Sequence, residues 1–477
     1  MTDSVRVRSA KVEAIAECWP MITALLGGTE EMREAGKTYL PQWPNEDDNF
    51  YKRRLAVATL LPAFSRTVEV LSGKPFSRPV TWADDVPARI VELFDDIDMQ
   101  GTNLHSFLAG VLEGAMGFGI NIVLVDYPPT NGEMTVAQTK ATGVRPYWVS
   151  IGANSLLDWR SERINGRELL THLRFVECVT EQDPQDEFAE VHVEQVRVLD
   201  SGRWRVYREK QNQNGQIEWA LHDEGVTSLK YVPAVPVYGK KLGFMCSKPP
   251  LTELAYLNVE HWQSKSDQQT ILHVARVPIL FGKGFDPDDE ITVGASTAVI
   301  SEKGEADLKY VEHSGKAIES GSKDLERLED LMRQIGAELL VIKPGRITVA
   351  QTRAEDEAGT CALQRIVQDF EDAADQMLQV TAQWLGEKSG GSLTIYNDFG
   401  AASLAEATAQ LLLDANIADV ISNETLFSEL QRRGLVKDNI TWDEEAKRIA
   451  SQPQRSALRK HENKPQRVSV NHEYEPG

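Results

Sequence analysis

The chain has 477 residues, of which 41% are hydrophobic and 26% charged, a composition that excludes disorder of the whole chain. No apolar run approaches the roughly 20 residues of a membrane-spanning helix, and the charged first residues are unlike a signal peptide. We therefore expect no membrane partner, and we expect the protein to stay in the cytoplasm or in a particle assembled there. Seventy-two acidic residues against 51 basic ones give a net charge of −21, which argues against gripping nucleic acid by phosphate neutralisation.

Residues 1–80 have a helical pattern. Asp47 and Asp48 precede an apolar helical segment, and acids are favourable there because they complement the helix dipole. Pro62 lies inside this segment and predicts a kink or a break. Gly73 is expected to end it.

Two more helices are predicted over 86–118, and the second leads through GAMGFG at 114–119 into a buried strand, INIVLVD. A dinucleotide-binding loop follows a strand and opens a helix, so the order here is reversed, and the small residues predict close helix–strand packing. Gly36-Lys37-Thr38 resembles the end of a phosphate-binding loop, but Glu31 takes the place of its first glycine. The four cysteines form no CxxC pair and the nine histidines no HExxH. We therefore expect no cofactor, no metal and no disulfide.

From about 145 to 240 the sequence changes to strands. Five segments alternate or are rich in β-branched residues, namely RPYWVSI, ELLTHLRFVECV, EQVRVLD, RWRVYRE and IEWALHD. Hairpin turns are expected at Asp200-Ser201-Gly202 and at 212–215. Helices packed on a mostly antiparallel sheet make the predicted class α+β.

A long helix is predicted at 250–276, and its second half, 263–270, is polar on all sides. A helix of this kind bridges two bodies or packs against copies of itself. A β-rich insert of about forty residues follows. The chain then returns in a helix at 318–340, whose apolar face consists of Leu325, Leu328, Met332, Ile335 and Leu339.

After an irregular stretch at 341–353, the longest helix is predicted from about 354 to 387. Its inner stripe is spaced by threes and fours and consists of Ala358, Ala362, Ile366, Phe370, Ala373, Met377, Thr381 and Trp384. Its acidic residues are expected to point outward and are Glu355, Asp356, Glu357, Asp369, Glu371, Asp372 and Asp375. Gly390-Gly391 should end the helix, before a returning strand and short helices over 401–450. The basic tail, 451–477, is poor in apolar residues and is expected to be disordered.

Four stretches of the chain resemble the tailed-bacteriophage portal proteins, the head–tail connector rings of capsids. They are YLPQWPNEDDNFYKRRLAVATLLPAFSRTVEVLSGKPFSRPV (39–80), PPLTELAYLNVEHWQSKSDQQTILHVARVPILFG (249–282), the long acidic helix with the preceding KPGRITVAQTR, and ISNETLFSELQRRGLV (421–436). Each stretch alone is a weak signal for the family, because portals have no catalytic motif. The order of the stretches carries more weight than any one of them.

The resemblance implies a portal-type fold with named parts. They would be a wing of helices on β-structure (1–248), a first stem helix (249–277), a small α/β clip (278–316), a second stem helix (317–340), a tunnel loop (341–353), the long wing helix with its returning strand (354–400), a helical crown (401–450) and the tail (451–477). It also implies a ring, usually a dodecamer, at one vertex of a capsid assembled in the host cytoplasm. Double-stranded DNA would cross this ring during packaging and ejection. The implied partners are the terminase large subunit, neck and head-completion proteins, the major capsid protein and the scaffolding protein.

The net charge acquires a role in such a ring. Twelve copies carry 12 × −21 = −252 formal charges, and an acidic wall repels DNA phosphates and keeps the duplex from sticking. Transient backbone contacts are expected from Lys343 and Arg346 in the tunnel loop and from Lys265 on the first stem helix. The clip should dock basic partners through its acidic turn, which consists of Asp286, Asp288, Asp289 and Glu290.

Two other functions stay open at this point. One is a soluble α+β enzyme with an unrecognised acid–base site, although the paired carboxylates, such as Asp84-Asp85 and Asp95-Asp96, have no histidine or glycine-rich frame nearby. The other is a different head–tail adaptor, which the length of the chain disfavours. The sequence favours a structural protein and not an enzyme.

Overall fold

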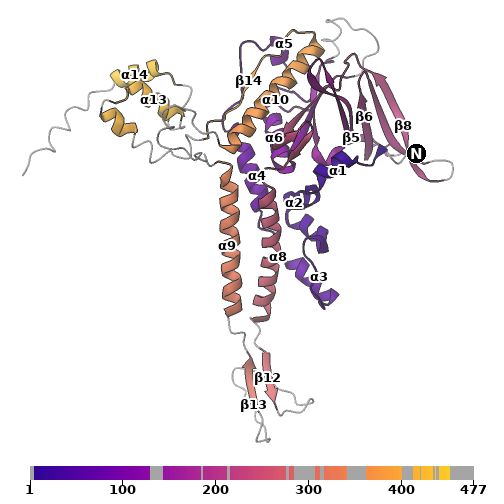
Figure 1. Ribbon diagram of the computed structural model, residues 1–477, viewed down its shortest axis with the longest axis vertical. Coiled ribbons are helices and arrows are strands. Elements are labelled where there is room, and N and C mark those ends of the chain that lie inside the picture. The colour runs from indigo at the N-terminus through magenta and orange to yellow at the C-terminus, as the bar shows by residue number, and fades with distance from the viewer. Residues whose placement is uncertain are drawn as a thin grey trace, which may run out of the picture. The chain divides into compact units, whose positions relative to one another are not determined.

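The computed structural model shows helices and antiparallel sheets, which confirms the predicted α+β class (Figure 1). It describes residues 5–128, 143–183, 186–211, 215–275, 279–283, 307–311, 316–340, 361–399, 412–418, 420–432, 436 and 440–451. The chain divides into two compact units, Met1–Asn397 and Asp398–Gly477, and each is treated by itself. Within the described ranges, no helix has the length and apolar character required to cross a membrane.

The first unit opens with four helices, α1 (Ala10–Ala16), α2 (Trp19–Ala35), α3 (Asp48–Val57) and α4 (Ala63–Gly73). The side chain of Asp47 caps α3, because it accepts hydrogen bonds from the backbone nitrogens of Asn49 and Phe50 at 3.0 and 3.2 Å. Pro62 stands immediately before α4, so the chain breaks between α3 and α4 as predicted.

A small sheet lies at the centre of this unit, in the strand order β3-β2-β9. Its strands are β2 (Ile120–Asp126), β3 (Tyr147–Gly152) and β9 (Ala234–Tyr238), and both neighbours run antiparallel to β2. The alternate residues Ile120, Ile122 and Leu124 belong to a core shared with α1 and the larger sheet. Two helices, α6 (Leu104–Phe118) and α10 (Ala362–Leu385), also pack on β2 and β9. With both faces buried, β2 needs the continuous apolar run seen in the sequence.

The turn from α6 into β2 depends on small residues, as the GAMGFG sequence predicted. Gly119 has φ +90°, and a Cβ atom there would lie 2.6 Å from the backbone carbon of Lys248. A Cβ on Gly114 would lie 2.5 Å from the side-chain nitrogen of Asn121. These glycines let helix and strand approach closely.

The larger sheet is a five-stranded antiparallel meander. Its strands are β4 (Leu156–Ile164), β5 (Arg167–Gln182), β6 (Glu190–Asp200), β7 (Arg203–Gln211) and β8 (Ile217–Val226). Asn165 and Gly166 form the hairpin between β4 and β5, and both have positive φ, of 51° and 81°. The strand β4 was not among the predicted strands, although Asn-Gly is a strong hairpin signal.

Short antiparallel pairs complete the strands of the unit. They are β1 (Thr81–Trp82) with β14 (Leu393–Thr394), β10 (Lys240–Gly243) with β11 (Cys246–Lys248), and β12 (Ile279–Lys283) with β13 (Asp307–Val311). The first of the two helices predicted over 86–118 is only the four-residue α5 (Ala88–Val91).

Two long helices enclose β12 and β13 in the sequence, α8 (Thr252–Ala275) and α9 (Lys316–Glu338). They lie side by side and antiparallel (Figure 1). His261 on α8 contacts Glu329 on α9, and Gln268, further along α8, contacts Ser322, which comes earlier on α9. Only three residues join α8 to β12, and four join β13 to α9. The hairpin therefore stays near the same end of the helix pair.

The description of α10 begins at Cys361, whose side chain caps the helix, so the predicted start near 354 lies outside the described residues. Phe370, Met377 and Thr381 are buried as predicted, whereas Trp384 is half-buried. The predicted end at Gly390-Gly391 is wrong, because Gly386 adopts the left-handed conformation and closes the helix after Leu385.

The outward direction predicted for the acids of α10 is also wrong for two of them. Asp375 accepts a hydrogen bond from the backbone nitrogen of Leu393 at 2.7 Å, and Glu371 accepts one from that of Ile395 at 3.0 Å. Burial raises the pKa of both carboxyl groups. Asp369 and Asp372 are exposed, as expected. The returning strand β14 is thus held by carboxylates of the helix that precedes it.

The second unit contains α13 (Asn423–Arg432) and α14 (Trp442–Ser451). Phe427 and Trp442 connect them, with ring centroids 5.6 Å apart. The side-chain oxygen of Ser422 caps α13, because it accepts a hydrogen bond from the backbone nitrogen of Thr425, 3.1 Å away. The tail after residue 451 lies outside the described residues.

Candidate functional site

The helix pair α8–α9 and the adjoining α3 contain the one predicted site residue that the structure describes. Lys265 is half-buried on α8, one helical turn after His261. Lys343 and Arg346 lie outside the described residues, and so do all four clip acids, Asp286, Asp288, Asp289 and Glu290. Their roles stay predictions.

Polar side chains of α8 are buried against the α3–α4 region. Asn258 is fully buried; its Nδ2 donates to the carbonyl of Leu61 and its Oδ1 accepts from the nitrogen of Phe64, both at 2.9 Å. Gln263 donates to the carbonyl of Tyr39 at 3.0 Å. The polar character of α8 is therefore explained by contacts inside one copy of the chain, in which side chains satisfy the backbone groups freed where α3 and α4 are interrupted.

Arg54 ties α3 to α8 from the other side. Its guanidinium donates to both carboxylate oxygens of Glu46, at 2.7 and 2.8 Å, and to the carbonyl of Pro41 at 2.8 Å. The guanidinium also lies 4.2 Å from the ring centroid of Trp43 and 3.5 Å from the hydroxyl of Ser266 on α8. The Arg54 and Glu46 side chains are only 2% and 1% exposed, so this is a buried, bidentate ion pair.

The contact between α8 and α9 is also partly polar. Gln268 donates to the carbonyl of Ile318 at 2.8 Å and lies 3.2 Å from the hydroxyl of Ser322. Gly321 makes room for it, because a Cβ there would be 2.1 Å from the Gln268 oxygen. His261 Nε2 lies 3.5 Å from a carboxylate oxygen of Glu329, and burial lowers the pKa of this histidine.

One face of α8 is exposed and acidic. Glu253, Glu260 and Asp267 follow one another at seven-residue spacing, so they lie along one stripe of the helix. Glu253 and Glu260 are exposed, whereas the side chain of Asp267 is 50% exposed and one of its carboxylate oxygens lies 3.9 Å from the Arg54 guanidinium on α3. We call these three residues the acidic stripe. Lys265 does not belong to it, because five residues after Glu260 correspond to a rotation of about 140°.

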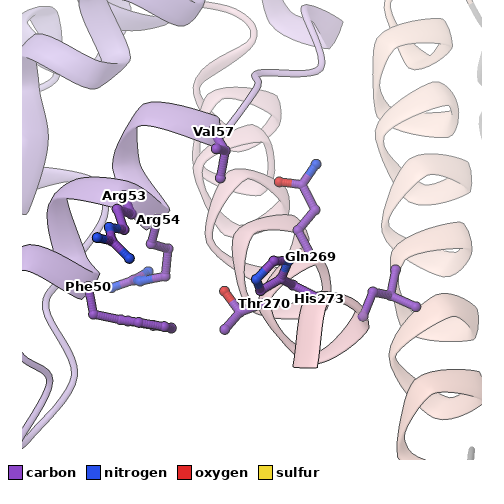
Figure 2. A pocket seen from close by; sticks show the side chains of 8 residues that line it. Phe50, Arg53, Arg54, Val57, Gln269, Thr270 and His273 are labelled. Carbon is purple, nitrogen blue, oxygen red and sulfur yellow. The ribbon is translucent and has the colours of Figure 1, made fainter. Parts of the chain in front are cut away.

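A groove of about 760 Å³ runs between α3 and the C-terminal part of α8 (Figure 2). It is lined by Phe50, Arg53, Arg54, Val57, Gln269, Thr270, Leu272 and His273. Phe50 is 40% exposed and Val57 is 63% exposed. We call it the α3–α8 groove.

The buried polar contacts of α8 were not predicted from the sequence. A signal was present, because Asn258, His261, Lys265 and Gln268 recur at intervals of three and four, the period of one helix face. Nothing in the pattern identifies their partners, such as the Leu61 carbonyl or the Glu329 carboxylate, since these are distant in sequence. Among the residues that the structure describes, no group of three histidine, cysteine or acidic side chains is arranged to hold a metal ion.

Comparisons with known proteins give one family and several structures. The model of a domain of unknown function, DUF4055, matches residues 250–385, the segment from the start of α8 to the end of α10. No curated protein matches the chain.

The solved structures to which the chain is similar come from gene transfer agent (GTA) particles. For the neck of an empty GTA particle, computed with C6 symmetry, the identity is 12% and the TM-score 0.40, covering 78% of this chain and 90% of the other. For the neck of the native particle, computed with C12 symmetry, the identity is 12% and the TM-score 0.40, covering 78% and 89%. For the virion of the native GTA particle, the identity is 12% and the TM-score 0.39, covering 76% and 88%.

Proposed function

We propose that this chain is a portal protein of a phage or phage-like particle, a structural subunit and not an enzyme. Copies would form a closed ring of twelve at one vertex of the capsid, around a channel for double-stranded DNA. The observation that carries the proposal is the antiparallel pair α8–α9 with the hairpin β12–β13 inserted between its helices. This is the order of helix, insert and helix that the portal-like sequence segments imply.

The remaining elements are assigned by the same order. The helices and sheets before α8 would be the wing, α8 and α9 the stem, and β12–β13 part of the clip. The helix α10 would be the long wing helix, while α13 and α14 would belong to the crown. The clip would dock the terminase large subunit and later the neck proteins through Asp286, Asp288, Asp289 and Glu290. The wing and crown would contact the major capsid protein and the scaffolding protein.

The acidic stripe gives the proposed channel a mechanism. The two exposed carboxyl groups of the stripe, Glu253 and Glu260, would place 24 carboxylates in a ring of twelve. Carboxylates repel phosphates, and the repulsion is weakened only over a distance of about 10 Å at ordinary salt. DNA would then move without breaking strong contacts. The cations Lys343, Arg346 and Lys265 would add brief contacts to its backbone.

The mass of the purified protein in solution tests the proposal. Twelve copies of a 53.2 kDa chain have a mass of about 640 kDa, which light scattering after size exclusion measures directly. We expect a particle of about this mass, and negative-stain images of rings with a central hole. A monomer, dimer or tetramer without a ring would contradict the proposal. The two other functions, a soluble enzyme or a different head–tail adaptor, would then be favoured.

A further inference from the structure

The α3–α8 groove has the features of a surface that another chain covers. Its aromatic and aliphatic side chains, Phe50 and Val57, are exposed at the two ends of the α3 side of the groove, with Arg53 and Arg54 between them (Figure 2). Gln269, on the α8 side, has a buried Oε1 atom that receives no hydrogen bond from any described group. Exposed apolar groups next to an unsatisfied acceptor are unfavourable in water and are typical of an interface.

The groove also offers a free positive charge. Arg53 lines it and is exposed, and in the described part of the chain it forms no ion pair, whereas Arg54 beside it pairs with Glu46 and Asp267. Lys52, also exposed, precedes it on α3. The groove is therefore suited to a partner that brings a carboxylate.

The complementary surface lies on the opposite flank of the same helix pair. Figures 1 and 2 both show α8 between α3 and α9. The outer face of α9 is charged, and several of its charges pair within the helix, as Lys323 does with Glu319 and Arg333 with Asp330. Glu326 is exposed on α9 and has no ion pair among the described residues. Glu338, at the other end of α9, is exposed and unpaired in the same way, so these two carboxylates of the helix are available for a partner.

The groove and this part of α9 lie at the same height along α8. Arg54 reaches Ser266 from the α3 side, while Gln268, two residues further on, reaches Ser322 from the α9 side. Glu326 follows Ser322 by one helical turn, about 6 Å. Rotation about a ring axis parallel to α8 preserves this height. A head-to-tail ring joins two different surfaces on opposite flanks of each copy.

We propose that the α3–α8 groove receives the exposed flank of α9 that carries Glu326 from the next copy in the ring, and that Arg53 pairs with Glu326 of that copy. This inference rests on the proposed function, since it requires a ring whose axis runs along α8 and α9. Phe50 and Val57 would be covered by the stems of the α9 side chains.

Charge reversal tests the pairing. We expect Arg53→Glu and Glu326→Arg each to reduce the ring fraction strongly in light scattering, and the double variant to restore it, because the reversed charges again attract. Lys230→Glu is the matched control, since Lys230 is an exposed lysine in the loop after β8, away from α3 and α9 in the sequence, and it should leave the ring intact. Thermal melting of each variant checks that the exposed positions leave the fold of the single chain unchanged.

The outcomes separate this inference from the proposed function. A wild-type protein that forms no ring contradicts the proposed function itself. A wild-type ring that survives both single reversals overturns the interface and leaves the portal proposal standing. Single reversals that dissolve the ring without rescue by the double variant overturn the pairing of Arg53 with Glu326.

A second variant tests the apolar part of the groove without using charge pairs. Val57 is 63% exposed, so Val57→Asp should not unfold the single chain. We expect it to raise the protein concentration needed for half-assembly by at least about tenfold, because a carboxylate would be placed in a covered apolar contact. An unchanged assembly curve would show that the groove stays open in the ring and would overturn the inference.

Discussion

Arg54 is the side chain on which the attachment of α3 to α8 depends. Replacing it with alanine leaves Glu46 buried without its ion-pair partner, and we expect a loss of about 3–5 kcal/mol in the free energy of unfolding. Lys52→Ala, on the exposed side of the same helix, is the matched control and should change it by less than about 0.5 kcal/mol. Urea unfolding of the three proteins measures both values. Equal stability of the two variants would mean that the buried pair contributes nothing.

The same ion pair predicts a pH dependence. The hydrogen bonds from Arg54 lower the pKa of Glu46. A carboxyl group with a lowered pKa in the folded state adds stability above its unfolded pKa of about 4.3, and this stability disappears as the pH falls through the folded pKa. We expect Glu46→Gln to be less stable than wild type at pH 7 and the gap to narrow below about pH 4. A gap that is constant from pH 7 to 3 would contradict the lowered pKa.

Asp375 is predicted to support β14 through its single backbone contact. Asp375→Ala removes the acceptor of the Leu393 nitrogen, and Leu393 is only 2% exposed, so water cannot replace it fully. We expect a loss of about 1–3 kcal/mol, measured by urea unfolding. Asp372→Ala removes an exposed carboxylate from the same helix and serves as the control, with little expected effect. Similar losses in both variants would show that the hydrogen bond does not matter.

At the scale of the elements, variants on the exposed faces of α8 and α10 test which of the two helices faces the DNA path. If the acidic stripe faces the channel, Glu253→Gln with Glu260→Gln should raise DNA binding by isolated rings by about tenfold at low salt, and the increase should shrink as salt is added. Asp369→Asn with Asp372→Asn neutralises two exposed acids of α10 and is the matched comparison. Stronger binding only in the α10 pair would place the DNA path along α10 instead.

Periodicity predicted most of these elements because burial of one face leaves a direct imprint on the sequence. The alternation in β5 to β8 and the stripe of Phe370 and Met377 in α10 are imprints of this kind. The polar contacts left no comparable imprint. Arg54 and Ser266 are 212 residues apart in the chain, and only the fold brings them together. Asp375 looked like a solvated acid because nothing in its own helix indicates that β14 returns to it.

At the scale of the whole molecule, the end of the chain is predicted to contribute nothing to assembly. Deleting residues 452–477 removes a basic segment with few apolar residues, which has little surface to bury. We expect the truncated protein to have the ring mass expected for its shorter chain and the melting temperature of the full chain. Light scattering and a thermal melt of the two proteins provide the comparison. Loss of the ring on truncation would show that the tail is structural.

The hydrogen bonds that hold α8 have a mechanical consequence. They run across the axis of the helix, from Gln268 to the start of α9 and from Asn258 to the break between α3 and α4. A force directed along α8 therefore loads these bonds together, in shear, instead of opening them one after another. Sliding by one helical turn, about 5.4 Å, would break all of them. The helix pair is thus stiff along its length, and a push on the β12–β13 end is transmitted to the sheets as displacement and not absorbed by sliding.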